Sequence, residues 1–484
     1  MLFTLFIVPL IASIIAFISS SLPRRATRYF AIAASLIPLI MLVAYGPGQW
    51  LNQTIQIPWL SPLAIDFHLK VDSLSLAFLY LTAIIIPISL LAARKEELYS
   101  PNIFYAFVLL LQCLLIGFFT AQNLILFVVF WESMLFPLYF IMILWGKSKR
   151  REAALQFLVY MIAGSALMVA GVLALYLAAG TFDIDTLAKM GVAKQLPYAP
   201  WIFAIFALAF SVKTPLFPFH GWLPSTYYEA STAGTILLSA LLSKAGIFGF
   251  FRIGINIFPD MMRASSPILL GLAIAGVLYG GMAAWMQRDY KRLIAFSSFS
   301  HVNFILAGIF VWNQSAHEGA ILQAFNHGIT IAGIFLVAGW LEERIGTTSI
   351  SPYSGLAKYL PQLCWLTMIF VLSSVALPGT NSFIGELLIL FGLFGLHPWL
   401  ASVLGLTVIL SVVYMLRWMQ HVFFEEPHLE LETQTEDIKL RELAIAFPLV
   451  ALIFWIGLYP QPMLNQIVPA VEQEQVMANG GENR

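Results

Sequence analysis

Six titratable side chains lie inside long apolar runs of this sequence, where a charged group is costly. A carboxylate or ammonium group at the centre of a membrane helix costs roughly 2.5–3.5 kcal/mol on insertion scales. Carboxylate, amine and imidazole groups can each gain or lose a proton when burial or a neighbouring charge changes their proton affinity. A series of such groups joined by water can therefore relay protons. The six residues are Glu132, Lys213, Lys244, His301, His327 and Glu386.

Each of the six residues also has a purely structural interpretation. Glu132 and Lys213 could form a buried ion pair that only stabilises the fold, and Lys244 and Glu386 could be structural as well. A lone buried histidine such as His301 is usually a hydrogen-bonded core residue. The whole series favours a functional interpretation, because six such groups in separate apolar segments need partners or water. A site for a polar solute is less favoured, since the sequence shows no cluster of Asn, Gln, Ser and aromatic residues.

The segments that carry these residues are predicted to cross a membrane. The chain has 484 residues, of which 60% are hydrophobic and only 10% are charged, whereas soluble domains carry about 25% charged residues. Spanning the hydrocarbon core takes about 20 apolar residues. The apolar run over residues 103–145 is nearly continuous, so it could be divided into spans differently. The predicted fourteen spans lie near 2–20, 29–45, 72–93, 103–119, 122–145, 154–179, 200–219, 232–258, 267–287, 292–313, 319–341, 361–392, 397–424 and 441–460.

The seventh predicted span is broken beside one of the titratable residues. Pro215 and Pro218 lack the N–H of a helical residue, and they free the carbonyls of Ser211 and Thr214. Lys213 lies between these two carbonyls. Broken helices at membrane depth are tolerated only where protein or water satisfies the freed groups, so this position is a candidate for a proton path.

A second break, at Pro378-Gly379, lies in the twelfth predicted span, about two turns before Glu386. Breaks in corresponding positions of two halves indicate a transport path. Because the breaks lie five spans apart, the sequence predicts an all-α membrane fold with two inverted five-helix repeats. The predicted units are N-terminal helices at 1–100, a first repeat at 101–260, a second repeat at 261–425, and an acidic loop, last helix and short polar tail at 426–484.

Basic residues predict the orientation of the chain. Most loop lysines and arginines follow odd-numbered spans, so both termini are expected on the periplasmic or lumenal side. Arg24, Arg25 and Arg28 follow the first apolar run instead of preceding it, which predicts a retained first helix and not a cleaved signal peptide. The acidic stretch 425–442 is interpreted as a solvated cytoplasmic connector and not as a docking site.

Charge and motifs argue against several other classes of function. The balance of 25 basic and 25 acidic residues gives no reason to expect a nucleic-acid partner. Cys113 and Cys364 lie in apolar runs, with no C-x-x-C motif and no His–Cys cluster. No GxGxxG or Walker motif is present. No cofactor or metal is therefore expected in this chain, and the expected partners include the lipid bilayer, protons and water.

Successive motifs in the sequence resemble those of the antiporter-like subunits of complex I and of Mrp-type antiporters. The resemblance covers about residues 70–420, in order and without large gaps. Glu386 resembles the M-type subunit, chain 4 of bacterial or cyanobacterial NAD(P)H-quinone oxidoreductase, because the L and N types and the Mrp subunits usually carry Lys there. The chain also lacks the long lateral helix of the L type after the last span. The motifs are FWESMLFPLYF, VKTPLFPFHGWLP, STAGTILLSALLSKAG, QRDYKRLIAFSSFSH, NHGITIAG and LPGTNSFIGE.

The resemblance implies a role for each titratable residue. It implies an ion pair between Glu132 and Lys213, a central relay lysine on the eighth span, relay histidines on the tenth and eleventh spans, and a terminal carboxylate on the twelfth. It also implies that quinone reduction elsewhere in the complex drives proton translocation. Quinone, flavin and iron–sulfur clusters, or ferredoxin, would then be bound by other subunits. L-type and N-type neighbours and a bacterial plasma membrane or thylakoid membrane are implied as well.

One departure from the family pattern leaves alternatives open. After HGWLP the family usually has an Ala-His pair that leads into Ala-Pro, whereas this chain has STYYEAS at 225–231, with Tyr227 where the histidine is usual. The role of this loop in proton entry or partner contact is therefore in question. One alternative is a specialised paralogue in a photosynthetic complex for inorganic-carbon uptake. Two others are a subunit of an Mrp-type cation/proton antiporter and a passive structural subunit.

Overall fold

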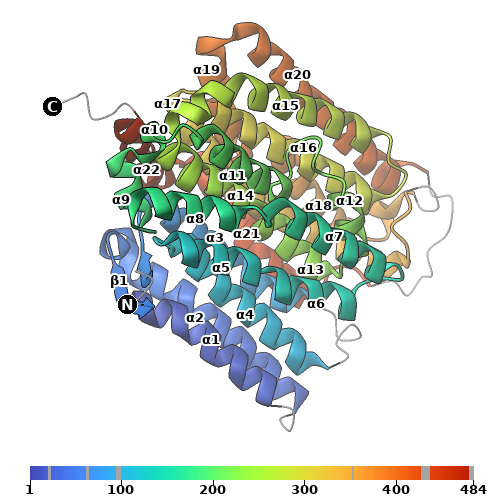
Figure 1. Ribbon diagram of the computed structural model, residues 1–484. Helices are drawn as coiled ribbons and strands as arrows, with labels where there is room; N and C mark the ends of the chain where they lie inside the picture. Colours follow the sequence, from blue (N-terminus) through green and yellow to red (C-terminus); the bar gives the residue numbers. More distant parts are fainter. Residues whose placement is uncertain (20–22, 61–64, 94–99, 351–353, 427–435, 479–484) are drawn as a thin grey trace.

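The computed structural model shows a bundle of long helices that lie side by side (Figure 1). Helices α1 (Leu2–Ile18) and α2 (Arg24–Trp50) form one edge of the bundle, and α19 (Asn381–Leu396) and α20 (Pro398–Met419) form the opposite edge. The N-terminus and α22 (Gln461–Ala478) lie at the same end of the bundle, on the left in Figure 1. The structure describes residues 1–19, 23–60, 65–93, 100–350, 354–426 and 436–478.

Within the described residues, eleven helices are long and apolar enough to cross a membrane, and four shorter apolar helices accompany them. The fourteen predicted spans each overlap at least one of these helices, and the predicted all-α membrane fold is confirmed. The helices between α2 and α15 are α3 (Ser73–Ala92), α4 (Pro101–Thr120), α5 (Leu124–Ser133), α6 (Leu135–Trp145), α7 (Arg150–Ser165), α8 (Met168–Ala179), α9 (Ile184–Met190), α10 (Val192–Gln195), α11 (Ala199–Lys213), α12 (Leu223–Glu229), α13 (Thr232–Leu237) and α14 (Ser243–Gly249).

The second half of the chain contains the longest helix of the described residues, α17, which runs through the bundle. Its polar residues are inside, because almost the whole of this helix is buried by its neighbours. The remaining helices are α15 (Pro259–Trp285), α16 (Tyr290–Phe310), α17 (Gln314–Ile345), α18 (Pro361–Ser374) and α21 (Leu440–Leu458), with a 3₁₀ turn at Leu356–Lys358 and a π-helical turn at Gln420–Phe424.

The two predicted helix breaks are confirmed. Helix α11 ends at Lys213, and the chain passes through Pro215 and Pro218, both preceded by cis peptide bonds, before α12 begins. Helix α18 ends at Ser374, and α19 begins after Pro378 and Gly379. Gly379 has a φ of +94°, a conformation that residues with a Cβ rarely adopt. Proline and glycine therefore end these helices for the reasons expected from the sequence.

The predicted eighth span has an irregular helix that the sequence does not reveal. Two π-helical turns, η2 (Leu238–Leu242) and η3 (Phe250–Ile255), flank α14. The span that contains them, Thr232–Ile255, is completely buried. π-Helical turns inside α-helices are rare and occur frequently at functional sites.

A β-hairpin precedes α3 and was not predicted. Strands β1 (Thr54–Leu60) and β2 (Ile65–Lys70) pair antiparallel. His68 and Lys70 of β2 contact the start of α9, through Asp183 at 3.0 Å and Asp185 at 2.7 Å. The hairpin therefore holds a connection of the first half of the bundle in place.

The end of the chain also differs from the prediction. A short polar tail was expected after Pro460, but the described residues form helix α22. Met463, Ile467, Ala470 and Val471 lie at helical spacing on one face and are buried, and α22 packs against α17 and α3. Burial of this apolar stripe explains why the segment is helical.

The acidic stretch is more closely attached to the bundle than a solvated connector. Its central residues, 427–435, lie outside the described residues. In the part that follows, Glu442 accepts two hydrogen bonds from Arg344, at 3.1 and 2.7 Å. The Asp437 carboxylate accepts the backbone N–H groups of Gln362 and Leu363 at the start of α18. This part of the stretch therefore caps and anchors helices of the second half.

The predicted boundaries of the four units of the chain, at 1–100, 101–260, 261–425 and 426–484, stay predictions.

Candidate functional site

Lys244 lies at the centre of the site and is fully buried. Its ammonium group donates hydrogen bonds to the carbonyl of Ser239 at 2.7 Å and to the hydroxyl of Ser243 at 3.2 Å. Ser239 belongs to the π-helical turn η2, which directly precedes α14. A backbone carbonyl five residues back is thereby turned toward the lysine. The local irregularity of the helix supplies part of the solvation that a buried ammonium group requires.

His327 of α17 is the next group along the site. Its Nδ1 lies 2.8 Å from the Lys244 ammonium nitrogen, and its Nε2 lies 3.3 Å from the hydroxyl of Ser298 on α16. A neutral imidazole can accept a hydrogen bond at one nitrogen and donate one at the other. The geometry therefore allows a proton to enter His327 from Lys244 on one side of the ring and to leave from the other side.

A small cavity separates His327 from His301. Its free volume is about that of one water molecule. The centroids of the two imidazole rings are 6.2 Å apart, too far for a direct hydrogen bond but suitable for a bridge through water. The buried Nε2 of His301 has no hydrogen-bond partner among the residues that the structure describes. The polar side chains that line the cavity are Ser297, His301, Gln323, His327, Thr330, Ser374 and Ser382.

Glu386 of α19 completes this series. Its Oε1 accepts hydrogen bonds from Nδ1 of His301 and from Nε2 of Gln323, both at 3.1 Å. The carboxylate is buried, and a buried carboxylate requires such donors. Four of the six predicted residues therefore form a series, from Lys244 through His327 and His301 to Glu386, with one water-sized gap between the two histidines.

The predicted ion pair between Glu132 and Lys213 is absent as a direct contact in the described residues, because no nitrogen–oxygen distance within 4.0 Å joins them. The Lys213 ammonium group instead donates to the carbonyl of Trp131 at 2.6 Å and lies 3.8 Å from the centroid of the Trp131 ring. That carbonyl lies in the last turn of α5, where carbonyls lack helical partners and the helix dipole favours a cation. Half-buried Glu132 is the next residue, and it still interacts electrostatically with Lys213.

The break after α11 is held by a residue from the second half of the chain. Asn303 of α16 donates to the carbonyl of Pro215 at 3.1 Å and accepts the N–H of Phe217 at 3.3 Å. The carbonyl of Ser211, which Pro215 frees, accepts the N–H of Leu216 instead. These three backbone groups of the broken segment are therefore satisfied by protein groups. Asn303 also lies only two residues after His301, so one helix contacts both the break and the relay.

The second break is held in a similar way. Asn326 of α17 donates to the carbonyl of Asn381 at 2.7 Å, and the Asn381 amide donates to the carbonyl of Asn326 at 3.2 Å. Asn381 is the first residue of α19, and its Oδ1 also accepts a hydrogen bond from Ser373 at the end of α18. Asn326 immediately precedes His327. Each break is therefore hydrogen-bonded to a helix turn that carries one of the two buried histidines, His301 or His327.

The loop that departs from the family pattern is packed against the eighth span. Tyr227 of α12 is fully buried, and its hydroxyl donates to the carbonyl of Leu238 in η2 at 3.4 Å. The Tyr227 hydroxyl also interacts with the hydroxyl of Ser243, which contacts Lys244. The tyrosine therefore extends the polar network of Lys244 by one side chain.

Sequence reasoning missed the neutral polar residues of the site. Gln323, Ser298, Asn303 and Asn326 contact the relay or hold the breaks, but none of them is costly enough in a membrane to stand out individually. A weak signal was available, because Gln323, Asn326, His327 and Thr330 follow helical spacing on α17. No group of three or more His, Cys, Asp or Glu residues in the described part of the chain is placed to hold a metal ion.

These features define a multi-pass helical membrane protein with two broken helices and a buried series of titratable side chains. The sequence pattern of the transmembrane family described as NADH:quinone oxidoreductase/Mrp antiporter matches residues 121–412. The chain belongs to this family.

Similar proteins agree with this assignment. The chain is 34% identical to NADH-quinone oxidoreductase subunit M of Rhodobacter capsulatus, over 92% of this chain and 90% of the relative. It is 34% identical to the subunit M of Escherichia coli K12, over 87% and 84% of the two chains. A chain of respiratory complex I from Thermus thermophilus with bound NADH has a TM-score of 0.89 and 31% identity, and covers 99% of this chain and 100% of its own.

A further structure shares only the fold. A chain of the Mrp complex from Dietzia sp. DQ12-45-1b has a TM-score of 0.87 but 21% identity, with 99% of both chains covered. The fold is therefore common to a chain of respiratory complex I and a chain of the Mrp complex, and the fold alone does not separate these two kinds of assembly.

Proposed function

We propose that this chain is the M-type, proton-translocating subunit of the membrane arm of a complex I-type NAD(P)H- or ferredoxin:quinone oxidoreductase. The observation that carries the proposal is the series of buried groups from Lys244 to Glu386, in which a water-sized cavity is the one gap. The identity to subunit M relatives over almost the whole chain supports it. The carboxylate at position 386 favours the M type, because the resemblance associates lysine at this position with the L, N and Mrp types.

The geometry supports a proton relay in three steps. Lys244 passes a proton to Nδ1 of His327, which lies within hydrogen-bond distance. A water molecule in the cavity carries the next proton from His327 to Nε2 of His301. His301 then donates to Glu386 through Nδ1. Each transfer changes the charge beside the next group, and this change drives the following step.

Lys213 and Glu132 supply the input to this relay. Lys213 docks on the carbonyl next to Glu132 without a direct ion pair, so the lysine can move between Trp131 and the carboxylate. Formation of that ion pair would withdraw positive charge from the region of α14 and alter the proton affinity of Lys244. Moving one proton against 100 mV costs about 2.3 kcal/mol, which rearrangement of one charge pair can supply.

The redox chemistry belongs to other subunits in this proposal. Quinone, flavin and iron–sulfur clusters, or ferredoxin, are bound elsewhere in the assembly, and L-type and N-type subunits are the neighbours in the membrane. The basic loops favour both termini on the periplasmic or lumenal side of a bacterial plasma membrane or thylakoid membrane. Tyr227 stands where the family usually has a histidine. A second candidate subtype of the same class is therefore the specialised paralogue in a photosynthetic complex for inorganic-carbon uptake.

Co-purification tests the class of assembly. A tag on this chain should isolate a peripheral redox arm together with L-type and N-type subunits, and the isolate should couple quinone reduction to proton translocation. Isolation of an assembly that catalyses sodium-dependent proton antiport, and that has no redox arm, would assign the chain to the antiporter class instead.

The Glu132→Ala variant tests the proposed input step. We expect the assembly to form with all its subunits and to translocate protons much more slowly, because Lys213 then has no carboxylate to approach. The measurement is proton uptake into vesicles driven by quinone reduction, with the subunit content checked in parallel. Normal proton translocation by this variant would favour a passive structural role for the first half of the bundle.

A further inference from the structure

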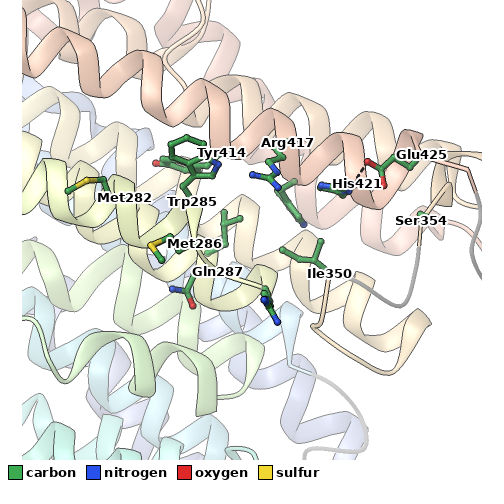
Figure 2. A pocket seen from close by; sticks show the side chains of 13 residues that line it. Met282, Trp285, Met286, Gln287, Ile350, Ser354, Tyr414, Arg417, His421 and Glu425 are labelled. Atoms are coloured by element: carbon green, nitrogen blue, oxygen red, sulfur yellow. Dashed lines mark ion pairs between the residues drawn. The ribbon is translucent and has the colours of Figure 1, made fainter.

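A pocket of about 910 Å³ lies outside the relay, between α15, α20 and the residues around Ile350. Figure 2 shows Arg417 of α20 and His421 of the π-helical turn that follows it on one side of this pocket, and Met286, directly after α15, on the other. A pocket of this size is at the upper end of those that hold small organic ligands. It therefore has room for a lipid headgroup with part of its acyl chains.

The walls of the pocket combine apolar and aromatic groups. Trp285 and Met286, at the end of α15, are 47% and 81% exposed, and Met282 one turn earlier is 52% exposed. Trp418 of α20 lines the same pocket. Tryptophan is enriched where the acyl region of a membrane meets the headgroups. The exposed apolar face next to the pocket is thus suited to acyl chains.

Two arginines give the pocket a positive charge. Arg288 follows α15 and Arg417 lies in the last turn of α20. Within the described part of the chain, neither guanidinium group has an ion-pair partner. The other two titratable side chains at this end of the pocket contact each other, because Nδ1 of His421 lies 2.7 Å from the carboxylate of Glu425. Guanidinium groups bind phosphate oxygens through paired hydrogen bonds.

We propose that this pocket binds an anionic phospholipid, with the phosphate between Arg288 and Arg417 and the acyl chains along Trp285 and Met286. The basic loops of the sequence predict that this end of the bundle faces the cytoplasm. The cytoplasmic leaflet carries anionic lipids, and basic pockets between membrane helices on that side bind their headgroups. Charge and location therefore favour an anionic lipid over a zwitterionic one.

The lipid site lies next to the relay. Tyr414 lines the pocket, and its hydroxyl lies 2.9 Å from that of Ser297. Ser297 also lines the small cavity between the two relay histidines. Tyr414 and Ser297 would thus separate the lipid in the pocket from the small cavity between the two histidines. The proposed lipid site does not depend on proton translocation by this chain.

Photocrosslinking of the complete assembly tests the lipid site. The assembly is reconstituted in phosphatidylcholine nanodiscs that contain a trace of photoreactive phosphatidylglycerol, and the crosslinked peptides are identified by mass spectrometry. We expect crosslinks in residues 282–293 and 414–425 that unlabelled phosphatidylglycerol removes and additional phosphatidylcholine does not. Equal crosslinking by a photoreactive phosphatidylcholine would overturn the proposal, as would protection of these peptides by a neighbouring subunit.

Substitution of the arginines tests the role of charge. Each arginine beside an anionic headgroup is worth about fivefold in affinity, so the double variant Arg288→Gln/Arg417→Gln should bind phosphatidylglycerol about 30-fold more weakly. The double variant Arg288→Lys/Arg417→Lys should keep most of the binding, because the charges remain. Arg151→Gln removes an exposed arginine at the start of α7, outside the pocket, and should change nothing. Unaltered binding by the double glutamine variant would contradict the proposal.

Discussion

The carboxylate of Glu386 is held by two donors, and only one of them can change its charge. Gln323 donates whether or not the relay is active, whereas His301 donates as a neutral ring or as an imidazolium cation. The hydrogen bond from His301 to the Glu386 carboxylate is therefore stronger when the ring is an imidazolium cation and weaker when the ring is neutral. This dependence gives the last residue of the series a direct means of responding to the one before it.

Replacement of Glu386 by Gln tests this role at the level of one residue. The amide keeps the size of the side chain and can still accept from Gln323, but it cannot accept a proton from His301. We expect complete assembly and a loss of proton translocation of about 100-fold, the lower range for removal of a positioned proton acceptor. The measurement is proton translocation in reconstituted vesicles. Glu318→Gln, which alters a carboxylate near the start of α17 that pairs with Gln314, should translocate protons normally.

Sequence reasoning identified charged residues better than it identified their contacts. The cost of a charge in a membrane made Lys244 and Glu386 conspicuous, and the structure places both in one series. The same reasoning paired Lys213 with Glu132, but the structure shows Lys213 on the carbonyl of Trp131. The Trp131 carbonyl is available because α5 ends there. The types of the side chains do not reveal a free backbone carbonyl, so the sequence could not predict this partner of Lys213.

At the scale of elements, the hydrogen bonds of Asn303 connect the broken segment after α11 to the helix that carries His301. A Cβ on Gly276 of α15 would lie 2.3 Å from Oδ1 of this asparagine. The small residue therefore leaves the space in which the amide sits. Asn303 is a positioning residue, since it touches the broken segment and not the groups that carry protons.

The Asn303→Leu variant tests the contribution of this contact to the fold. Leucine is of similar size, but it leaves the Pro215 carbonyl and the Phe217 N–H without a partner, at about 1–3 kcal/mol for each buried group. We expect a lower melting temperature of the purified assembly and a reduced rate of proton translocation. Asn465→Leu removes an exposed amide of α22 that accepts from Gln461, and it should leave both values nearly unchanged. A melting temperature unaffected by Asn303→Leu would show that the broken segment holds its own conformation.

The β-hairpin has a pH-dependent attachment to the bundle. Burial raises the pKa of Asp183, but hydrogen bonds from His68 and Thr186 outweigh it and lower this pKa from 3.8 to about 2. A carboxylate with a depressed pKa stabilises the fold above its ordinary pKa, and this stabilisation is lost as the pH falls toward 2.

The Asp183→Asn variant tests this attachment. We expect it to lower the melting temperature of the purified assembly at pH 7, and the difference from the unaltered protein should shrink as the pH falls from 4 toward 2. Thermal unfolding followed across this pH range provides the measurement. A difference that is equal at pH 7 and below pH 3 would mean that the carboxylate contributes through its shape and not through its charge.

The sequence predicted the long helices and the two helix breaks, but not the π-helical turn, the β-hairpin or helix α22, and each outcome has a physical reason. Long apolar runs and prolines made the helices and both breaks predictable. The π-helical turn at Leu238–Leu242 was not predicted, because its residues have the composition of an ordinary apolar helix. The hairpin at Thr54–Lys70 and helix α22 were missed although both had signals. Thr54–Leu60 contains β-branched and aromatic residues, and α22 has apolar residues at helical spacing.

At the scale of the whole molecule, the relay crosses the interior of the bundle between helices that lie far apart in sequence. Its groups come from α14, α16, α17 and α19, so the series exists only when the predicted second repeat packs against the eighth span. The family assignment follows from sequence similarity and fold, while the roles of the individual residues are proposals based on their contacts. The inverted relation between the two halves is consistent with matching breaks and stays a prediction.

The most direct test of the relay is the number of protons translocated per electron by the Lys244→Met assembly, with Lys189→Met as the control. Methionine keeps the length of the lysine side chain but cannot carry a proton, and Lys189 is an exposed residue of α9. The account predicts that the Lys244→Met assembly contains all its subunits and translocates fewer protons per electron, while Lys189→Met is normal. A normal ratio in the Lys244→Met assembly would contradict the proposed relay.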